Sequence, residues 1–331
     1  MMKAVLHEGA SGRKGLKYGE IDSTEPKEGE VRVRLKTAGL NHRDLFIPDR
    51  HKAEDPALVL GSDGAGIVDA VGDGVDSVKK GDAVIINPSL GWEKNSDVPP
   101  EGFEIVGLPF HGTFAEYITV PAENAVEKPD FLSWEEAGVL ALSAMTAYRA
   151  LFTRAKVTEG MTVLIPGASG GAGTCLLQFA VAAGAKVYVT SRSEEKRKQA
   201  LELGAAEAID SEADWNEALA GEKVDVVIES VGAATFNKSV DQLRRGGTLV
   251  AFGASAGDTV EFNLRKFFYG QYNLLGSTMA SAEELQEMLG FIEEHEIRPV
   301  MDKSFALSDF EEAFDRLENA DMMGKIVFNI E

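Results

Sequence analysis

Short apolar runs broken by polar residues dominate the first 120 residues of the chain. Residues 31–35 alternate between apolar and charged side chains with a period of two, which predicts a strand with one buried face. Further β-branched runs follow, separated by Gly, Pro and Asp (67–71, 83–86 and 117–120). Strands this short and this closely spaced predict a compact barrel or folded sheet. Residues 87–109 are rich in Pro, Gly, Asn and Asp and predict an extended loop.

The periodicity changes after about residue 125. Ser133 and Glu136 have the spacing of a capping box, which predicts that a helix begins there. Strand-like and helix-like segments then alternate, which predicts a doubly wound parallel sheet, the Rossmann architecture. The expected strands are 162–166, 187–190, 207–210, 224–229, 248–253 and 273–278, and the expected helices are 174–183, 194–203, 212–219 and 233–244. Helices at 282–293 and 308–319 and a strand at 325–328 complete the predicted elements.

A glycine-rich loop follows the first strand of this alternating region. Residues 163–173 read Val-Leu-Ile-Pro-Gly-Ala-Ser-Gly-Gly-Ala-Gly and lead into an Ala- and Leu-rich helix. In this context glycines let the backbone approach a pyrophosphate, whose charge is favoured by the N–H groups of the helix N-terminus. The loop therefore predicts a dinucleotide site, against the alternative of a glycine turn without a ligand. The expected cofactor-binding residues are Gly167, Ser169, Gly170, Gly171 and Ala172, with Gly232 and Gly253 from later strand ends.

The end of the second strand indicates which dinucleotide is bound. A site for NAD usually has Asp or Glu there, which accepts a hydrogen bond from the ribose 2′-hydroxyl. This chain instead has Ser191 and Arg192, whose hydroxyl and guanidinium groups suit a 2′-phosphate, and Lys196 follows one helical turn later. NADPH is therefore the predicted cofactor. The alternative is that Arg192 and Lys196 are solvated charges at a helix start.

Composition narrows the class of protein. The length of 331 residues suggests two domains, and the formal net charge of −21 argues against nucleic acid or an anionic membrane as a partner. The single cysteine, Cys175, excludes an internal disulfide and a cysteine-based zinc cage, and a buried apolar role is expected for it. Pro166 and several glycines interrupt the uncharged stretch 160–185, so it is not expected to span a membrane. The first residues lack the apolar core of a signal peptide, and the predicted location is the cytoplasm.

Several motifs in a fixed order resemble those of a known superfamily. They are Gly61-Ser62-Asp63-Gly64-Ala65-Gly66, Gly112-Thr113-Phe114-Ala115-Glu116-Tyr117, Thr146-Ala147-Tyr148-Arg149-Ala150-Leu151, the loop 167–173 and the closing Gly324-Lys325-Ile326-Val327. As a set they are similar to the medium-chain dehydrogenase/reductase superfamily over essentially the whole chain. The resemblance implies an α/β protein with a GroES-like β-rich catalytic domain (1–124 and 280–331), a Rossmann domain (125–279) and an active site between them. It also implies a homodimer joined near 273–278.

The chain departs from the zinc alcohol dehydrogenases of this superfamily at the positions of their metal ligands. The resemblance puts their Cys ligand at Asn41, their His-Glu pair at Ser62 and Asp63, and their third ligand near Leu142. A catalytic zinc needs about three protein ligands, so none is expected here. The region of the structural zinc, 87–109, has no cysteine. Three histidines, His42, His51 and His111, are expected to be scattered on the surface rather than to form an unrelated metal site.

Without a Lewis acid to stabilise an alkoxide, oxidation of simple alcohols is not expected. The zinc-free branch that the chain resembles includes quinone oxidoreductases and reductases of α,β-unsaturated aldehydes and ketones. The resemblance therefore implies hydride transfer from NADPH to a quinone or an enone, for which the protein supplies orientation and electrostatics.

Three residues are the expected contacts near the reacting groups. Asn41 would donate a hydrogen bond to a substrate carbonyl or the nicotinamide ribose, and Asp44 would hold that geometry; a local capping or turn role is the alternative for both. Thr146 resembles the family threonine that approaches the nicotinamide, against a core-facing helix threonine. For Ser62 and Asp63, a turn between strands and an active-site role are equally compatible with the sequence.

Two further functions remain open. The first is an enoyl-thioester reductase of the same superfamily, although residues 1–124 show no obvious basic patch for a CoA phosphate. The second is a non-catalytic NADPH-binding protein such as a redox sensor. The loops near 44–56, 87–111 and 262–272 contain several aromatic residues and suggest only an apolar or aromatic ligand.

Overall fold

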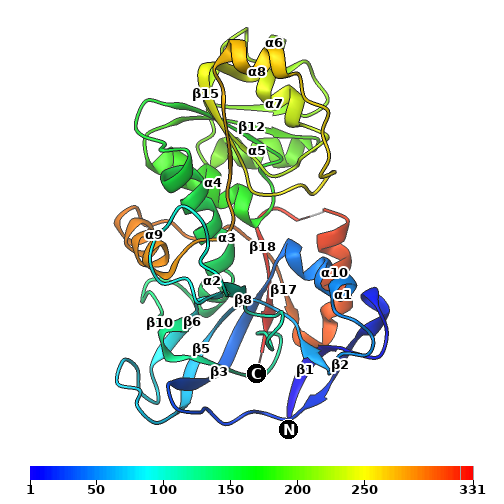
Figure 1. The fold of residues 1–331 in the computed structure, drawn as a ribbon, viewed down its shortest axis with the longest axis vertical. Helices are drawn as coiled ribbons and strands as arrows, with labels where there is room; N and C mark the ends of the chain where they lie inside the picture. Colours follow the sequence, from blue (N-terminus) through cyan, green and yellow to red (C-terminus); the bar gives the residue numbers. More distant parts are fainter. Residues whose placement is uncertain (321, 331) are drawn as a thin grey trace. The chain divides into compact units, whose positions relative to one another are not determined.

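The computed structural model describes residues 1–320 and 322–330 and divides the chain into two compact units (Figure 1). Unit 1 comprises Met1–Ser143 and Ala280–Glu331, and unit 2 comprises Ala144–Met279. The resemblance implied that the first domain boundary follows residue 124, whereas the two units of the structure divide after Ser143. The reason is that the short helix α2 (Trp134–Gly138) packs against strands of unit 1. The expected capping box at its start is present, because Glu136 N donates to Ser133 Oγ and Ser133 N donates to a Glu136 carboxylate oxygen.

Unit 1 is built on a seven-stranded sheet in the order β10-β6-β5-β3-β18-β17, with β9 also paired to β3. Its core includes Phe114, Phe314 and Phe328, whose rings meet edge to face. The strands of unit 1 are β1 (Met2–His7), β2 (Leu16–Ile21), β3 (Glu30–Leu40), β4 (Leu58–Val59), β5 (Asp63–Val71), β6 (Ala83–Ile86), β7 (Ser89–Leu90), β8 (Glu104–Ile105), β9 (Tyr117–Pro121), β10 (Ala125–Glu127), β17 (Met301–Ala306) and β18 (Lys325–Asn329). Its helices are η1 (Gly12–Gly15), η2 (His42–Leu45), α1 (Ile47–Arg50), η3 (Ala122–Asn124), α9 (Ala282–Glu294), η5 (Leu307–Asp309) and α10 (Phe310–Glu318).

The pairing of β18 with β3 joins the two chain segments that make up unit 1. In Figure 1 the red strand β18 runs in the same sheet as the blue strand β3. The two strands are antiparallel, and Ile326 lies opposite Leu40. This register brings Lys325, the first residue of β18, next to Asn41, the residue that directly follows β3.

Unit 2 contains a six-stranded sheet in the order β13-β12-β11-β14-β15-β16, and neighbouring strands in this order are parallel. Numbered along the sheet's own chain order, this is 3-2-1-4-5-6, the doubly wound arrangement. The fold class predicted from the β-α alternation is therefore confirmed.

The elements of unit 2 agree with most of the expected ranges. Its first strand is β11 (Thr162–Pro166), and the uncharged stretch around it folds as a strand, a glycine loop and a helix, as predicted. The strand expected at 248–253 begins earlier, at Leu243, because the ladder with β14 resumes there beyond a register shift. The other elements are β12 (Lys186–Ser191), β13 (Glu207–Asp210), β14 (Val224–Glu229), β15 (Leu243–Ala251), β16 (Asn273–Gly276), α4 (Gly171–Ala182), α5 (Glu194–Glu202), α6 (Trp215–Ala218), α7 (Phe236–Gln242) and α8 (Leu264–Gly270). Helix α3 (Ala141–Tyr148) contains the division between the units, and a π-helical segment η4 (Arg149–Arg154) follows it.

Among the residues that the structure describes, we find no helix with the length and apolar character that a membrane crossing requires.

Candidate functional site

A cluster of buried polar side chains lies in unit 1 where strand β3 ends. Its members are Asn41, Asp63, Ser143 and Lys325, none of them more than 5% exposed, and we call this set the Lys325 cluster. Asn41 directly follows β3, Asp63 begins β5 and Lys325 begins β18, so three adjacent strands supply three of the side chains. Ser143 comes from helix α3.

The ammonium group of Lys325 is the centre of the cluster. Its Nζ donates to Asn41 Oδ1 at 2.5 Å, to Ser143 Oγ at 3.1 Å and to Asp63 Oδ2 at 3.3 Å. An ammonium group has three N–H donors, so these contacts use all of them. The resulting cation is buried but fully hydrogen bonded.

Asp63 balances this charge and links the cluster to the backbone. Its Oδ2 also accepts from Asn41 Nδ2 at 2.9 Å, and its Oδ1 accepts from the backbone N–H of Leu142 at 2.7 Å. The carboxylate therefore ties together the three chain positions that the resemblance assigned to metal ligands. The sequence left Asp63 between a turn and an active-site role; in the structure its carboxylate contacts Asn41, Lys325 and the backbone of Leu142.

Asp44 lies beside the cluster and anchors the turn after β3. Its Oδ2 accepts from the backbone N–H of Asn41 at 2.8 Å, an arrangement that caps the short helix η2. The other oxygen, Oδ1, is buried and has no hydrogen-bond partner among the described residues. Burial raises the pKa of the Asp44 carboxyl to about 6, although the nearby Arg43 charge acts in the opposite direction.

Ser62 is held by contacts of a different kind. Its hydroxyl donates to the carbonyl oxygen of Val106 at 2.7 Å, and the Arg43 guanidinium donates to the same carbonyl oxygen at 2.9 Å and to the Ser62 hydroxyl. Burial lowers the pKa of Arg43, which still leaves a guanidinium charged at neutral pH. Ser62 therefore links the backbone at Val106 to the start of β5.

The donor set in this part of unit 1 does not fit a catalytic zinc. Asn41 offers an amide oxygen already bound to Lys325, and the two oxygens of Asp63 already accept three hydrogen bonds. Zinc prefers thiolate, imidazole and carboxylate ligands and needs about three from the protein. Within residues 1–320 and 322–330, no group of three or more His, Cys, Asp or Glu side chains is arranged to hold a metal ion.

One histidine expected at the surface is buried. His51 is 6% exposed, because its ring contacts the ring of His7, with 2.8 Å between the two Nδ1 atoms. His7 Nε2 also lies 2.9 Å from the carbonyl oxygen of Gly12. This pair joins strand β1 to the turn after α1. His42 and His111 are exposed, as expected.

In unit 2 the glycine-rich loop joins β11 to the N-terminus of α4. Gly167 has a φ of 66°, and a Cβ there would lie 2.8 Å from a Val231 methyl group, so the position requires glycine. Gly170 is the N-cap of the 12-residue helix α4, and Ser169 and Ala172 flank it in the loop and the first turn. The loop thus presents backbone N–H groups at a helix N-terminus, the arrangement that suits a pyrophosphate.

A buried carboxylate holds the neighbouring loop after β14. Glu229 accepts from the backbone N–H groups of Val231 and Gly232 and from the hydroxyls of Thr235 and Ser239, at 2.7–3.1 Å. Gly232 is required there, because a Cβ would lie 2.3 Å from the carbonyl oxygen of Gly257. Sequence reasoning missed Glu229; its signal was a carboxylate directly after the apolar run 226–228. Gly253 lies two residues after the end of the adjacent strand β15, and a Cβ there would lie 3.0 Å from Ser230 O.

The residues expected to select the cofactor lie around the end of β12. Arg192 is exposed, and its guanidinium makes no hydrogen bond or ion pair within the described residues. Ser191 Oγ accepts from Ser193 N at 3.3 Å. Lys196 lies in the first turn of α5, with its backbone N–H bonded to Ser193 Oγ. The guanidinium of Arg197, one position later, donates to Ser191 O and to the Asp210 carboxylate. Asp210, at the end of strand β13, is therefore already paired.

Two further residues considered from the sequence lie on helices α3 and α4. Thr146 is 8% exposed on helix α3 of unit 2, and Cys175 is buried on α4, as expected for a small apolar residue. Of the aromatic residues considered for substrate contact, several are exposed (Phe46, Phe110, Phe268 and Tyr269). Lys325 was not singled out from the sequence as a site residue. Its signal was a lysine at the start of a strand whose next three residues are apolar.

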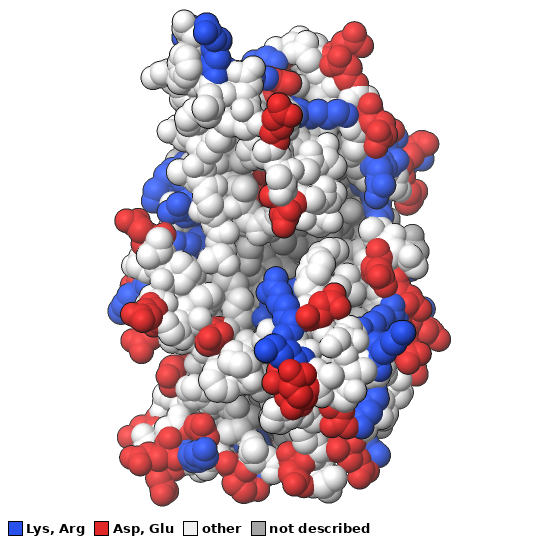
Figure 2. All heavy atoms as spheres, turned by 45° about the vertical axis from the view of Figure 1, so that its right-hand side comes forward, with Lys and Arg blue, Asp and Glu red and all other residues white. Residues whose placement is uncertain are grey.

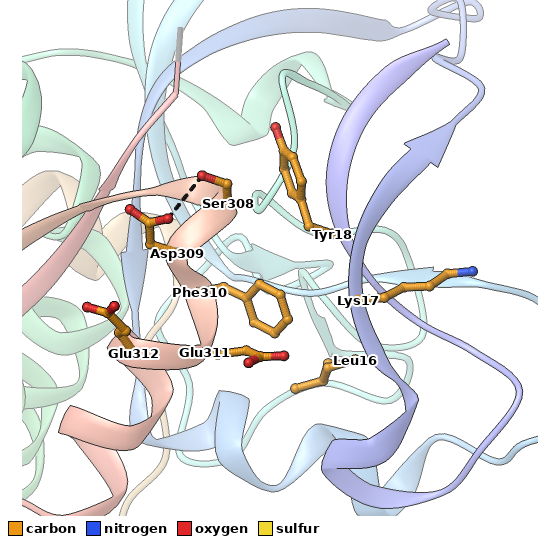
Figure 3. A pocket seen from close by; sticks show the side chains of 8 residues that line it. All are labelled: Leu16, Lys17, Tyr18, Ser308, Asp309, Phe310, Glu311 and Glu312. Atoms are coloured by element: carbon orange, nitrogen blue, oxygen red, sulfur yellow. Dashed lines mark hydrogen bonds between the residues drawn. The ribbon is translucent and has the colours of Figure 1, made fainter.

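Other surface features lie away from these residues. A hollow of about 440 Å³ in unit 1 is lined by Leu16, Lys17, Tyr18 and residues 308–312, and Figure 3 shows Phe310 within it. None of the predicted site residues lines this hollow. Figure 2 shows Asp and Glu side chains in scattered groups among uncharged residues, with Lys and Arg between them.

Comparison with known families matches both units. Residues 27–130 match the alcohol dehydrogenase GroES-like domain, and residues 171–294 match the zinc-binding dehydrogenase family. A zinc-type alcohol dehydrogenase-like protein of Schizosaccharomyces pombe is 34% identical over 100% of this chain and 99% of its own length. The quinone oxidoreductase of Rattus norvegicus is 30% identical over 91% of this chain and 89% of its own.

Solved structures agree with this assignment. The crystal structure of an NAD-dependent alcohol dehydrogenase has a TM-score of 0.93 at 34% identity and covers 100% of both chains. A crotonyl-CoA carboxylase/reductase in complex with NADP has a TM-score of 0.91 at 26% identity, covering 99% of this chain and 95% of that one. The GroES-like assignment of unit 1 and the nucleotide-dependent dehydrogenase fold are therefore confirmed. With both units matched in the expected order, the chain is an oxidoreductase that belongs to the medium-chain dehydrogenase/reductase superfamily.

Proposed function

We propose that this protein is an NADPH-dependent, zinc-independent reductase that transfers hydride to quinones or α,β-unsaturated carbonyl compounds. The observation that carries the proposal is the Lys325 cluster, in which a buried ammonium and its hydrogen bonds already use the oxygen atoms of Asn41 and Asp63. Without a metal Lewis acid, an alcohol lacks the means to form a stabilised alkoxide, whereas an electron-poor alkene or quinone accepts hydride directly. The name of the rat relative, quinone oxidoreductase, supports this substrate class.

The proposed cofactor is NADPH, which supplies the hydride when bound. The glycine loop at 167–173 and the Glu229-held turn at Gly232 would hold the dinucleotide, and both positions exclude a Cβ. Arg192, exposed and not engaged within the described chain, would bind the 2′-phosphate together with Ser191 and Lys196. The NADP complex of the crotonyl-CoA carboxylase/reductase supports this choice, whereas the NAD-dependent alcohol dehydrogenase is the contrary precedent.

Asn41, Asp44 and Thr146 are the residues that we propose near the reacting groups. Reduction of an enone places hydride on the β-carbon and a proton on the α-carbon; reduction of a quinone places hydride and a proton on the acceptor to give the hydroquinone. The protein's part is to orient the acceptor and to donate a hydrogen bond to its carbonyl oxygen. Asn41 is the proposed donor, Asp44 supports the turn that carries it, and Thr146 would contact the nicotinamide.

A panel of acceptors tests the proposal against its alternatives. The purified protein should oxidise NADPH with benzoquinones and with simple enones, and much more slowly with crotonyl-CoA. Preference for crotonyl-CoA would favour the enoyl-thioester reductase, the second candidate supported by the crotonyl-CoA carboxylase/reductase likeness. Binding of NADPH without turnover of any acceptor would favour a redox sensor and contradict the reductase.

We also propose that the protein is a cytoplasmic homodimer. Strand β16 is the last strand of the unit 2 sheet and pairs only with β15 among the described residues, so one edge remains for another strand. Helix α8, which precedes it, exposes Leu264, Phe268 and Tyr269. Light scattering should give twice the chain mass, and the variant Phe268→Ser/Tyr269→Ser should shift the mass toward the monomer. A wild-type monomer at micromolar concentration would contradict the dimer.

A further inference from the structure

Lys325 controls which way the Asn41 side chain faces. Because an ammonium group only donates hydrogen bonds, the Asn41 atom 2.5 Å from Nζ is the amide oxygen. The hydroxyl of Ser143, 3.2 Å away, donates to the same oxygen. A rotated amide would put its N–H groups against the ammonium, so this orientation is strongly favoured.

The amide nitrogen of Asn41 is consequently only partly used. One N–H donates to Asp63 Oδ2 at 2.9 Å, a short and charge-assisted contact. The other has only a long contact of 3.4 Å with the carbonyl oxygen of Gly39. This second N–H is the donor that remains for a ligand.

The cation also changes the strength of that donor. A hydrogen bond to an amide oxygen polarises the amide group and makes its N–H a better donor, and the effect is larger where water is excluded. Lys325 is 3% exposed and Asp63 is fully buried, so little solvent screens the ammonium. Lys325 therefore both orients the Asn41 amide and strengthens it.

Stability alone does not account for this arrangement. A buried ion pair is often no more stabilising than well-packed apolar residues of similar volume, because both charges lose their hydration. The chain nevertheless buries Lys325 at the start of strand β18, just after Gly324, where a Cβ would lie 2.1 Å from the carbonyl oxygen of Val300.

We propose that Lys325 is a positioning residue of the reductase, acting through Asn41: its ammonium fixes and polarises the amide that donates to the substrate carbonyl. The inference rests on the proposed function. In this account a cation–amide–carbonyl chain of hydrogen bonds withdraws charge from the acceptor during hydride transfer.

Four variants test this role: Lys325→Met, Asp63→Asn, the double variant of the two, and Lys303→Met as a matched control. Lys303 is an exposed lysine on the adjacent strand β17, and its loss should leave kcat and melting temperature unchanged. Each single variant leaves one buried charge unpaired and should lower the melting temperature, and the neutral double variant should recover most of that loss. We expect kcat of the double variant to stay about tenfold or more below wild type, with NADPH affinity within about twofold. Recovery of kcat together with the melting temperature would overturn the proposal and leave Lys325 a purely structural residue.

Two further measurements separate this proposal from the function on which it rests. Because Lys325 acts through Asn41, adding Lys325→Met to Asn41→Ala should reduce kcat no further than Asn41→Ala alone; full additivity would contradict the proposal. In wild type, the side-chain amide of Asn41 should show two well-separated, slowly exchanging protons in ¹⁵N-resolved NMR spectra. In the Lys325→Met/Asp63→Asn double variant, the two proton signals should move together and exchange fast. An unchanged Asn41 signal would overturn the positioning role even if no acceptor were reduced, and failure of turnover alone would contradict only the reductase.

Discussion

The side chains of Lys325 and Asn41 meet at 2.5 Å although the two residues are 284 positions apart in the chain. Their contact follows from the antiparallel pairing of β18 with β3, in which Ile326 lies opposite Leu40. This pairing places Lys325 in the same buried cluster as Asn41.

Replacing Asp44 by Asn should remove a pH dependence of stability. Burial raises the pKa of Asp44 from 3.8 to about 6, so the folded protein keeps this proton to higher pH than the unfolded chain does. The stabilising contribution of the protonated group is therefore complete below about pH 4 and is lost as the pH rises through about 6. The free energy of unfolding of wild type, relative to Asp44→Asn, should fall by about 3 kcal/mol over this interval and level off above it.

Urea unfolding of both proteins across this pH range measures that difference directly. The asparagine keeps an oxygen that accepts from Asn41 N, so the turn itself should persist in the variant. A difference between the two proteins that does not change with pH would show that folding does not raise the pKa of Asp44.

Replacing Arg192 by Ala should weaken NADPH binding far more than NADH binding. Loss of a guanidinium that binds a 2′-phosphate is expected to cost about 1.5–3 kcal/mol, or roughly ten- to a hundredfold in Kd, whereas NADH has no such phosphate. Fluorescence titration with each cofactor gives the two values. The matched control is Lys198→Ala, which removes an exposed cation of the following helix α5 that pairs with Glu194. Equal losses for both cofactors in Arg192→Ala would refute the assignment of NADPH.

Replacing Glu229 by Ala should destabilise unit 2 and weaken cofactor binding. The substitution leaves the N–H groups of Val231 and Gly232 and two hydroxyls without their acceptor, at an expected cost of about 2–5 kcal/mol. Glu229→Gln retains one acceptor oxygen and should lose less. Denaturant unfolding ranks the three proteins, and a Glu229→Ala variant as stable as wild type would show that the turn does not depend on the carboxylate.

The fold of unit 2 was largely predictable because its signals are local. The alternation of strands and helices and the glycine loop at 167–173 lie within short stretches of sequence, and each indicates the same architecture. The start of β15 at Leu243 was missed, since Arg244, Arg245 and two glycines give that segment no strand-like pattern.

The candidate site was predictable only in part. Asn41 stands out because it occupies a position where zinc relatives have a ligand, and Asp44 because it lies in the same segment; this needs no knowledge of long-range contacts. Lys325 and the Asp63 contacts depend on strand register between distant segments, which no local pattern encodes. Glu229 likewise reads as an ordinary charge at a strand end until the turn that it caps is seen.

The central claim is that hydride transfer by this protein needs NADPH and no metal. The most direct measurement is the rate of NADPH oxidation with a quinone acceptor, taken before and after exhaustive dialysis against a chelator, with the zinc content of the same sample determined in parallel. Our account predicts an unchanged rate in protein that contains far less than one zinc per chain. Loss of activity on chelation, with recovery on addition of zinc, would contradict it.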